Sequence, residues 1–154
     1  MFSKAESAQI RQEFWTTLGR LIKRQPSADG IKINWINYKT GVKDIYFRMH
    51  TSPKIASIGI EITHNDEELR ALFFDQFEAL KTYLHNILGE DWVWDNSYTN
   101  DYGIQCSRIY IELHGKNYFL KDDWSDLFEF FKERLIKLDQ FWCDANDTFI
   151  ELSH

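Results

Sequence analysis

The sequence lacks the features that mark several large classes of protein. No run of uncharged apolar residues approaches the roughly 20 that cross a membrane as a helix, and the polar start Met1–Glu6 has no apolar signal segment. The two cysteines, Cys106 and Cys143, match no metal-binding or redox spacing. No glycine-rich phosphate-binding motif is present. We therefore expect a soluble cytoplasmic protein with reduced thiols that contacts no membrane.

What is present suits one folded domain. The chain has 154 residues, of which 44% are hydrophobic and 16% aromatic, and this is more than enough to exclude a disordered chain. No composition shift, linker or internal repeat divides it. We therefore expect a single domain over residues 1–154.

The formal net charge of −6 conceals an uneven distribution. Residues 1–50 carry nine Lys or Arg against four Asp or Glu, whereas residues 51–154 carry nine against twenty. We favour the interpretation that the two parts attract each other within the fold. The alternative is that the basic part contacts phosphate groups of a partner.

Apolar residues recur at helical spacing in three segments. The first helix is expected over residues 4–25. A second runs from a cap at Asn65, with Glu68 completing a capping box, to a stop at Gly89. A third is expected over residues 121–154, capped by Asp122 and Asp123. Because a helix of about 30 residues is roughly 45 Å long, its tail is expected to pack on the N-terminal helix or on a second subunit, as in a homodimer.

Alternating apolar and polar residues predict five strands, over residues 31–38, 42–50, 55–64, 92–98 and 104–114. Short turns such as 39–41, 51–54 and 100–103 favour antiparallel pairing. The predicted fold class is α+β. Its order is a helix, a three-stranded meander, a helix, a β-hairpin and a long helix. The sheet is mostly antiparallel, with the helices mainly on one face.

This order is similar to the core of the PD-(D/E)XK nucleases, which place an Asp on the second strand and a Glu-x-Lys on the third. Asp44 and Glu61 stand at the corresponding positions and are candidate catalytic residues and Mg²⁺ ligands. Thr63 replaces the expected Lys, so the charge that steadies the reacting phosphate is missing. The favoured alternative is that Glu61 pairs with Arg48 or Arg108 on a neighbouring strand.

The sheet face opposite the isoleucines of residues 58–62 is rich in aromatic and charged side chains. Its candidate binding residues are Tyr46, Arg48, His50, Arg108, Tyr110, Glu112 and His114. Trp94 is a further candidate, because Trp92, Trp94 and Tyr98 are expected to share one side of their strand and could join this face. Such a face could stack on bases or grip a peptide. The alternative is that these side chains only pair with one another across the strands of a solvent-exposed sheet, or that this second face of the sheet is covered as well.

Three segments together resemble a prokaryotic family of unknown function, DUF4268. They are Arg11–Trp15, then Asn34–Trp35 with the strand Asp44–Met49, and finally Asp123–Trp124 before the aromatic helix. Members of that family also occur at the C-terminus of larger proteins whose front half looks like a nuclease. The resemblance implies an accessory role near DNA restriction or defence, and it carries no catalytic residues.

The leading hypothesis is a non-enzymatic binding module that serves a nucleic-acid-processing or defence system, with a nucleic-acid or protein partner. One alternative is a degenerate metal-dependent nuclease that uses Asp44 and Glu61. Another is an acidic partner-binding protein of the immunity type, suggested by the charge of residues 51–154. No cofactor is expected, apart from Mg²⁺ under the nuclease hypothesis.

Overall fold

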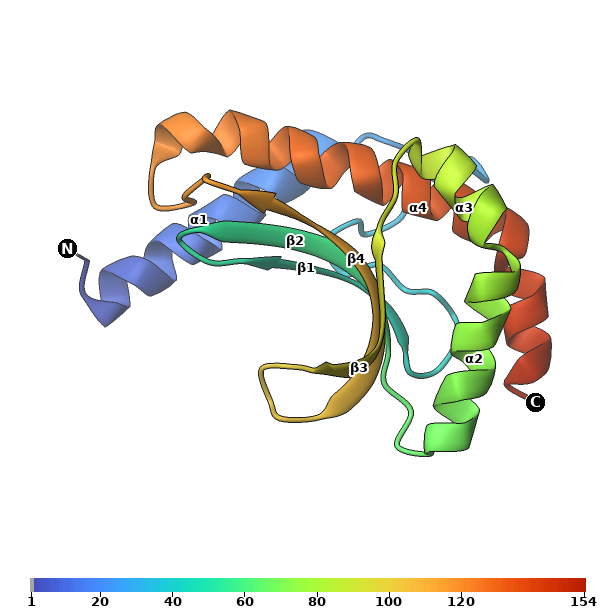
Figure 1. Ribbon diagram of the computed structural model, residues 1–154. Helices are drawn as coiled ribbons and strands as arrows, with labels where there is room; N and C mark the ends of the chain where they lie inside the picture. Colours follow the sequence, from blue (N-terminus) through green and yellow to red (C-terminus); the bar gives the residue numbers. More distant parts are fainter. Residues whose placement is uncertain (1) are drawn as a thin grey trace.

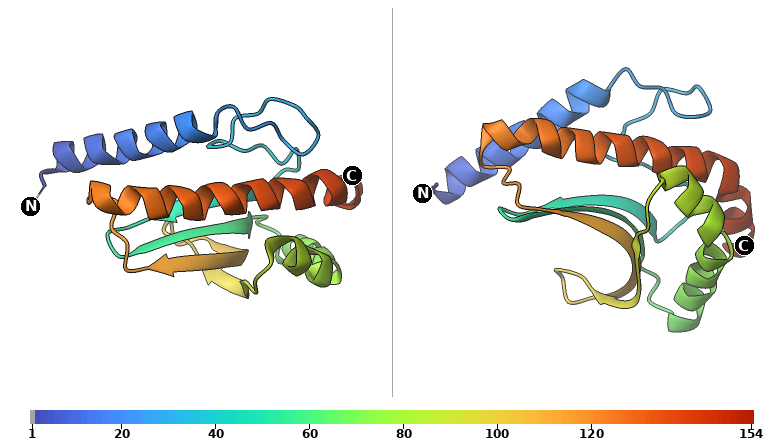
Figure 2. Two further views of the ribbon diagram at one scale, coloured as in Figure 1. Left: turned by 90° about the horizontal axis from the view of Figure 1, so that it is seen from above. Right: turned by 45° about the horizontal axis from the view of Figure 1, so that its top comes forward.

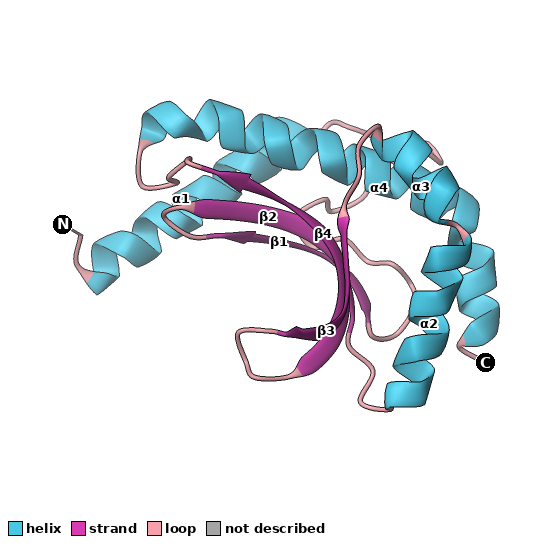
Figure 3. Ribbon diagram, in the orientation of Figure 1, coloured by secondary structure: helices cyan, strands magenta, loops and turns pink. Residues whose placement is uncertain are grey.

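In the computed structural model, which describes residues 2–154, four α-helices and a four-stranded antiparallel sheet form an α+β domain (Figures 1 and 3). The elements are α1 Lys4–Ile22, β1 Ile45–Thr51, β2 Ile55–Ile62, α2 Glu67–Ala79, α3 Lys81–Leu88, β3 Val93–Thr99, β4 Gln105–His114, the 3-10 turn η1 Lys121–Asp123 and α4 Trp124–Leu152. The sheet order is β1-β2-β4-β3, so β2 and β4 are its central strands.

The sheet is strongly curved, and the helices lie on its convex side (Figures 1 and 2). Ile58, Ile60 and Ile62 of β2 face these helices and are fully buried. Each buried isoleucine contributes roughly 1.5–3 kcal/mol relative to an exposed one. The alternate residues of β2 face the concave side, so the period of two in the sequence separates an apolar face from a polar one.

The long helix α4 packs against α1 near its start and against α2 near its end. Near its start, Trp124, Phe128 and Phe131 pack around Phe14 of α1. Near its end, Phe149 packs against Phe77 of α2, with ring centroids 4.3 Å apart. The tail of this helix therefore packs on α2, rather than on the N-terminal helix as one of the two expectations had it. Within residues 2–154, no helix is long and apolar enough to cross a bilayer.

The predicted first strand, residues 31–38, is not a strand. Its buried ring, Trp35, donates a hydrogen bond from Nε1 to the carbonyl of Gln25 at 2.8 Å. Tyr38 donates its hydroxyl proton to Asp139 of α4 at 2.5 Å. Trp35 is thereby fixed to the chain just after α1, and Tyr38 to α4. The alternating apolar residues therefore reflect these anchors and not a strand ladder. The sheet consequently has four strands, not five, and the PD-(D/E)XK order predicted from five is wrong.

The predicted helix over 66–88 is two helices with a corner at Leu80. Leu80 leaves helical geometry, with φ −105° and ψ 12°, and α3 begins again at Lys81. No Gly or Pro marks this corner in the sequence. Gly89 does end α3 in the left-handed conformation as predicted, with φ 70°. The cap of α2 is Asp66, which accepts from the N–H groups of residues 68 and 69, and not Asn65.

The start of α4 also differs from expectation. Asp123 stands at the N-cap position but makes no side-chain cap hydrogen bond. Its Oδ2 accepts instead from the Asn117 N–H at 2.9 Å. The turn η1 occupies residues 121–123, where the long helix was predicted to begin.

Candidate functional site

The curvature of the sheet and the β3–β4 hairpin enclose a cavity of about 530 Å³ on the concave side. We call it the concave cavity. Its floor consists of Tyr46, Arg48, His50, Ser57, Glu61 and Arg108, and the hairpin contributes Tyr98, Tyr102 and Ile104. Cavities of roughly 300–1,000 Å³ with a few convergent polar groups are typical of small-ligand sites.

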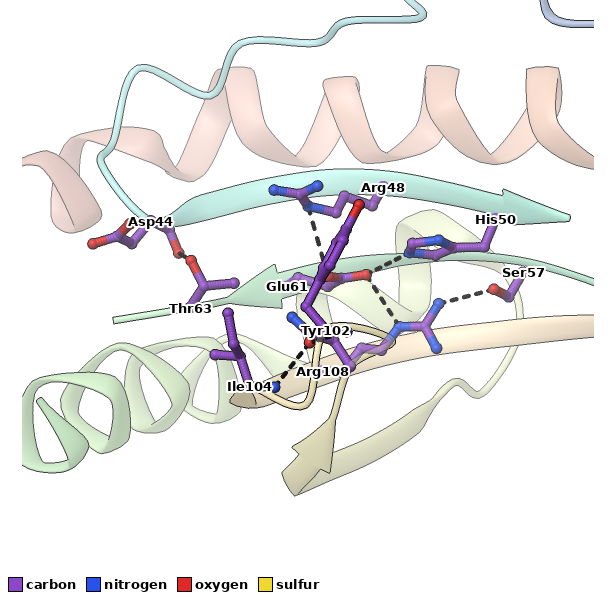
Figure 4. Close-up of polar contacts among 10 residues, drawn as sticks. Asp44, Arg48, His50, Ser57, Glu61, Thr63, Tyr102, Ile104 and Arg108 are labelled. Carbon is purple, nitrogen blue, oxygen red and sulfur yellow. Dashed lines mark hydrogen bonds and ion pairs between the residues drawn. The ribbon is translucent and has the colours of Figure 1, made fainter. Parts of the chain in front are cut away.

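Glu61 is the centre of the floor (Figure 4). Only 3% of the residue is exposed. His50 Nε2 lies 2.8 Å from its Oε2, Arg108 Nε lies 3.5 Å from the same oxygen, and Arg48 Nε lies 3.6 Å from Oε1. Because removing a carboxylate from water costs several kcal/mol unless opposite charges surround it, these partners offset the cost of burying Glu61 and fix its side chain in place.

Arg108 is the second buried charge, with 3% of the residue exposed. It stands directly opposite Glu61 in the β2–β4 register. Its Nη2 donates a hydrogen bond to Ser57 Oγ at 2.8 Å. The guanidinium carbon lies 4.3 Å from the ring centre of Tyr110 and 4.8 Å from that of Tyr98. Cation–π contact of this kind stabilises a desolvated guanidinium, so the planar group is held rigidly.

Gly59 makes this arrangement possible. It pairs with Arg48 of β1 on one side and Tyr110 of β4 on the other. A Cβ at this position would lie 2.6 Å from Tyr110 Cβ and 2.6 Å from the Ile109 carbonyl oxygen. Glycine in a strand interior often marks such a close approach. Its absent side chain therefore lets Tyr110 reach the underside of Arg108.

Arg48 differs from Arg108 in its freedom to move. Its side chain is 42% exposed, and its guanidinium carbon lies 4.2 Å from the ring centre of Tyr46. The Nε atoms of both arginines have no hydrogen-bond acceptor among residues 2–154. Glu61 therefore holds the two groups by charge, at distances longer than a good hydrogen bond, and Arg48 is free to turn toward a ligand.

Titratable groups near the site favour binding over nucleophilic chemistry. Burial raises the pKa of Tyr98 above its ordinary value, so its phenol is a neutral hydrogen-bond donor beside Arg108. Burial also raises the pKa of Cys106 on β4 to about 11 and, away from this site on α4, that of Cys143 to about 12. Both thiols are therefore protonated at neutral pH and offer no thiolate nucleophile.

Most of the candidate binding residues from the sequence lie together. Tyr46, Arg48, His50, Arg108 and Glu112 all line the concave cavity. Tyr110 supports Arg108 through its ring without lining the cavity. The favoured interpretation of Glu61, an ion pair with Arg48 or Arg108, is confirmed with both arginines.

Two candidate binding residues lie elsewhere. Trp94 pairs with Ile109 on the helix-facing side, and its Nε1 donates to His85 Nε2 at 3.1 Å. A register shift between Asp95 and Tyr98 turns Tyr98 toward the cavity, so the expectation that these two rings share one side is wrong. His114 is exposed and contacts Glu112 at 3.3 Å.

Asp44 and Glu61, the candidate metal ligands, are separated in the structure. The Asp44 carboxylate lies at the start of β1 beside Thr63 and points away from Glu61 (Figure 4). The Asp44 carbonyl accepts a hydrogen bond from the Thr63 N–H at 2.9 Å. In the part of the chain that the structure describes, no three His, Cys, Asp or Glu side chains are grouped to hold a metal ion.

Three residues of the site were not singled out from the sequence: Ser57, Gly59 and Tyr102 carried no assigned binding role. Alternation in β2 did place Ser57 and Gly59 on the same face as Glu61. The available signal was a glycine, Gly59, in the interior of a strand. Tyr102, with 85% of the residue exposed at the hairpin tip, had no sequence signal beyond its place in a turn.

Comparison with known proteins gives one finding. Neither the comparison with curated proteins nor that with solved structures gives a match. A family model described as "Domain of unknown function (DUF4268)" matches residues 10–146. This range includes all the helices and strands described above, apart from the first residues of α1 and the last residues of α4. The resemblance noted from the sequence is thereby confirmed, and the chain belongs to the DUF4268 family.

Proposed function

We propose that the protein is a non-enzymatic binding module and that the concave cavity takes a ligand with one anionic group beside a planar group, as in a nucleotide unit. The observation that carries the proposal is the buried Glu61, which gathers Arg48, His50 and Arg108 on the cavity floor. Such a ligand suits an accessory role in a nucleic-acid-processing or defence system.

The anionic part of the ligand follows from the charges on the floor. On the floor, Arg48 and Arg108 face the single carboxylate of Glu61, so these three groups together leave one positive charge. The other two carboxylates of the lining, Asp101 and Glu112, belong to the β3–β4 turn and to β4. Guanidinium groups match phosphate and carboxylate oxygens in a planar, two-pronged geometry. Since Glu61, Ser57 and the tyrosines already hold Arg108, its contact with an anion costs little further ordering, and the half-exposed Arg48 turns toward the ligand.

The planar part follows from the aromatic walls. Tyr46, Tyr98 and Tyr102 line the cavity, and a base or other flat group stacks readily on such rings. The same lining contains Asp101 and Glu112. These carboxylates repel a long run of phosphates, so the cavity suits a single nucleotide unit better than an extended strand.

The proposal assigns no chemical step to the site. Both thiols are protonated at neutral pH, and the Asp44 carboxylate points away from Glu61. Binding without turnover is therefore the function that these side chains support best.

Isothermal titration of nucleoside monophosphates, the matching nucleosides and acetate tests the proposal. We expect the monophosphates to bind more tightly than either fragment. Arg48→Gln should weaken binding by about tenfold or more, because a hydrogen bond to a charged group contributes roughly 1.5–3 kcal/mol. Arg11→Gln, a charge-matched change on exposed α1, should leave it unaltered.

Two results would overturn the proposal. One is that no monophosphate binds to the wild type. The other is that Arg48→Gln and Arg11→Gln bind equally well. Tighter binding of acetate than of the monophosphates would instead assign the site to a carboxylate ligand and refute the nucleotide.

A further inference from the structure

A second charged feature lies where α1 ends. Arg20, Lys23, Arg24 and Lys32 line one surface hollow of about 590 Å³, which we call the basic hollow. All four residues are exposed, and the lining contains no carboxylate. The nearest acidic residue in sequence, Asp29, lines a different cavity beside α4. The basic hollow thus concentrates four positive charges on a chain whose net charge is −6.

These four cations have no partner inside the protein. Among residues 2–154, none of them makes an ion pair or a side-chain hydrogen bond. Among residues 2–154, Arg48 is the only one of the nine Lys and Arg residues of the N-terminal part that forms an ion pair with an acidic residue beyond position 50. Attraction between the two parts of the chain, the favoured interpretation of the charge distribution, therefore does not account for the basic hollow.

Helix polarity explains only part of the cluster. Cations in or after the last turn of a helix interact favourably with its negative end, and this accounts for Arg20, Lys23 and Arg24. Lys32 belongs to the following irregular segment, ten residues beyond the end of α1 at Ile22. Its presence in the same hollow requires the chain to fold back, and no helix effect accounts for that.

The fold-back is held by specific hydrogen bonds. Asp139 of α4 accepts from the Ala28 N–H at 2.7 Å, and the Ser27 N–H donates to the Ile31 carbonyl at 2.9 Å. Trp35 is fastened to the Gln25 carbonyl at 2.8 Å. The backbone that carries the cations is thus fixed before any partner arrives, which lowers the ordering cost of binding.

An adjacent hollow of about 490 Å³ continues the surface. It shares Lys23 and Lys32 with the basic hollow, and its other walls include Ile33, Trp35 and Ile36. Positive charges beside a recess with apolar walls match a strand of nucleic acid, whose phosphates alternate with sugars and bases.

We infer that the basic hollow is a contact surface for the phosphate backbone of a nucleic acid, with the adjacent hollow receiving a sugar or base. It shares no lining residue with the concave cavity, and the inference does not depend on what that cavity binds. Four phosphate contacts make binding strongly dependent on salt and weakly dependent on sequence.

Fluorescence anisotropy with labelled single-stranded and duplex oligonucleotides tests the inference. We expect binding at low salt, with a slope of about −3 in log K against log salt concentration, as four neutralised phosphates require. The variant Arg20→Gln/Lys23→Gln/Arg24→Gln/Lys32→Gln should bind at least about tenfold more weakly, with a slope close to zero. Circular dichroism checks that it folds.

A matched variant removes the same charge elsewhere. Lys4→Gln/Arg11→Gln/Lys43→Gln/Lys54→Gln also loses four exposed cations and should retain most of the affinity. Equal losses in the two variants would refute a localised surface, and no binding by the wild type at low salt would refute the inference outright. Binding that depends on the basic hollow to phosphatidylserine vesicles or polyglutamate, with none to oligonucleotides, would assign the surface to a membrane or an acidic protein and overturn it.

Discussion

The central strand β2 is buried on both of its faces, but different forces hold them. On the convex face of β2, Ile58, Ile60 and Ile62 pack against helices without directional bonds. On the concave face, Ser57 and Glu61 are 5% and 3% exposed, and their order depends on charge and hydrogen bonds with Arg108. A strand can thus support a stable core and prepare a binding site through alternate residues. Four changes test this difference, from the largest expected effect to the smallest.

Ile60→Ala should produce the largest loss of stability. The side chain is fully buried under the helices, and such truncations cost about 4 kcal/mol in unfolding free energy because a cavity remains. Urea unfolding followed by circular dichroism measures it. Leu72→Ala, at a residue that is 44% exposed, should cost far less. Similar losses at both positions would show that the convex face is not the main source of stability.

Glu61→Ala should cost about 3 kcal/mol, because it leaves Arg108 buried without its opposing charge. The double variant Glu61→Leu/Arg108→Met should recover much of this loss, since apolar residues of similar size often replace a buried ion pair without cost. Unfolding free energies of the three proteins decide the point. A double variant as unstable as the single one would mean that shape, and not charge, orders the concave face.

Gly59→Ala should destabilise by about 2 kcal/mol through overpacking, because its Cβ would meet Tyr110 Cβ and the Ile109 carbonyl oxygen at 2.6 Å. The strands must move apart, so binding in the concave cavity should weaken as well. Scanning calorimetry and titration measure the two effects. Gly115→Ala, where a Cβ meets nothing within 4 Å but φ is 82°, should lower stability without altering binding.

The smallest effect concerns His64, just after β2. The ring is 7% exposed and stacks on Phe73 with centroids 4.6 Å apart. Burial lowers its pKa below the ordinary 6.5. The unfolded chain therefore takes up the proton first as pH falls, so the stability contributed by the neutral ring is lost as pH drops below about 6.5. The melting temperature of the wild type relative to that of His64→Phe should therefore fall as the pH drops below about 6.5. An equal difference at pH 5 and pH 8 would contradict this sign.

The sequence predicted the parts of the fold that depend on local periodicity. The alternation in β2 and β4 identified the polar face and paired Glu61 with its arginines, since antiparallel neighbours share a face. The segment 31–38 was wrongly predicted as a strand because Trp35 is anchored to Gln25 and Tyr38 to the distant Asp139, and a period of two does not reveal such partners. The register shift that separates Trp94 from Tyr98 is equally non-local.

The candidate site was predictable as a list of residues but not as a cavity. Arg48, His50 and Arg108 could be placed on one face from alternation alone. The enclosure depends on the curvature of the sheet and the return of the β3–β4 hairpin, which arise from the packing of the whole chain. The basic hollow requires Lys32 to approach the end of α1, and that approach rests on Asp139, over a hundred residues away.

The corner at Leu80 has a consequence for the shape of the whole protein. A straight rod touches an arched surface along only a short stretch and leaves gaps at both ends. With a joint between α2 and α3, one segment of chain follows the outer arc of the sheet in two shorter spans (Figure 1). The outer layer of helices is thus bent where the sheet is curved. We expect a substitution that joined α2 and α3 into one straight helix at Leu80 to reduce the curvature of the sheet.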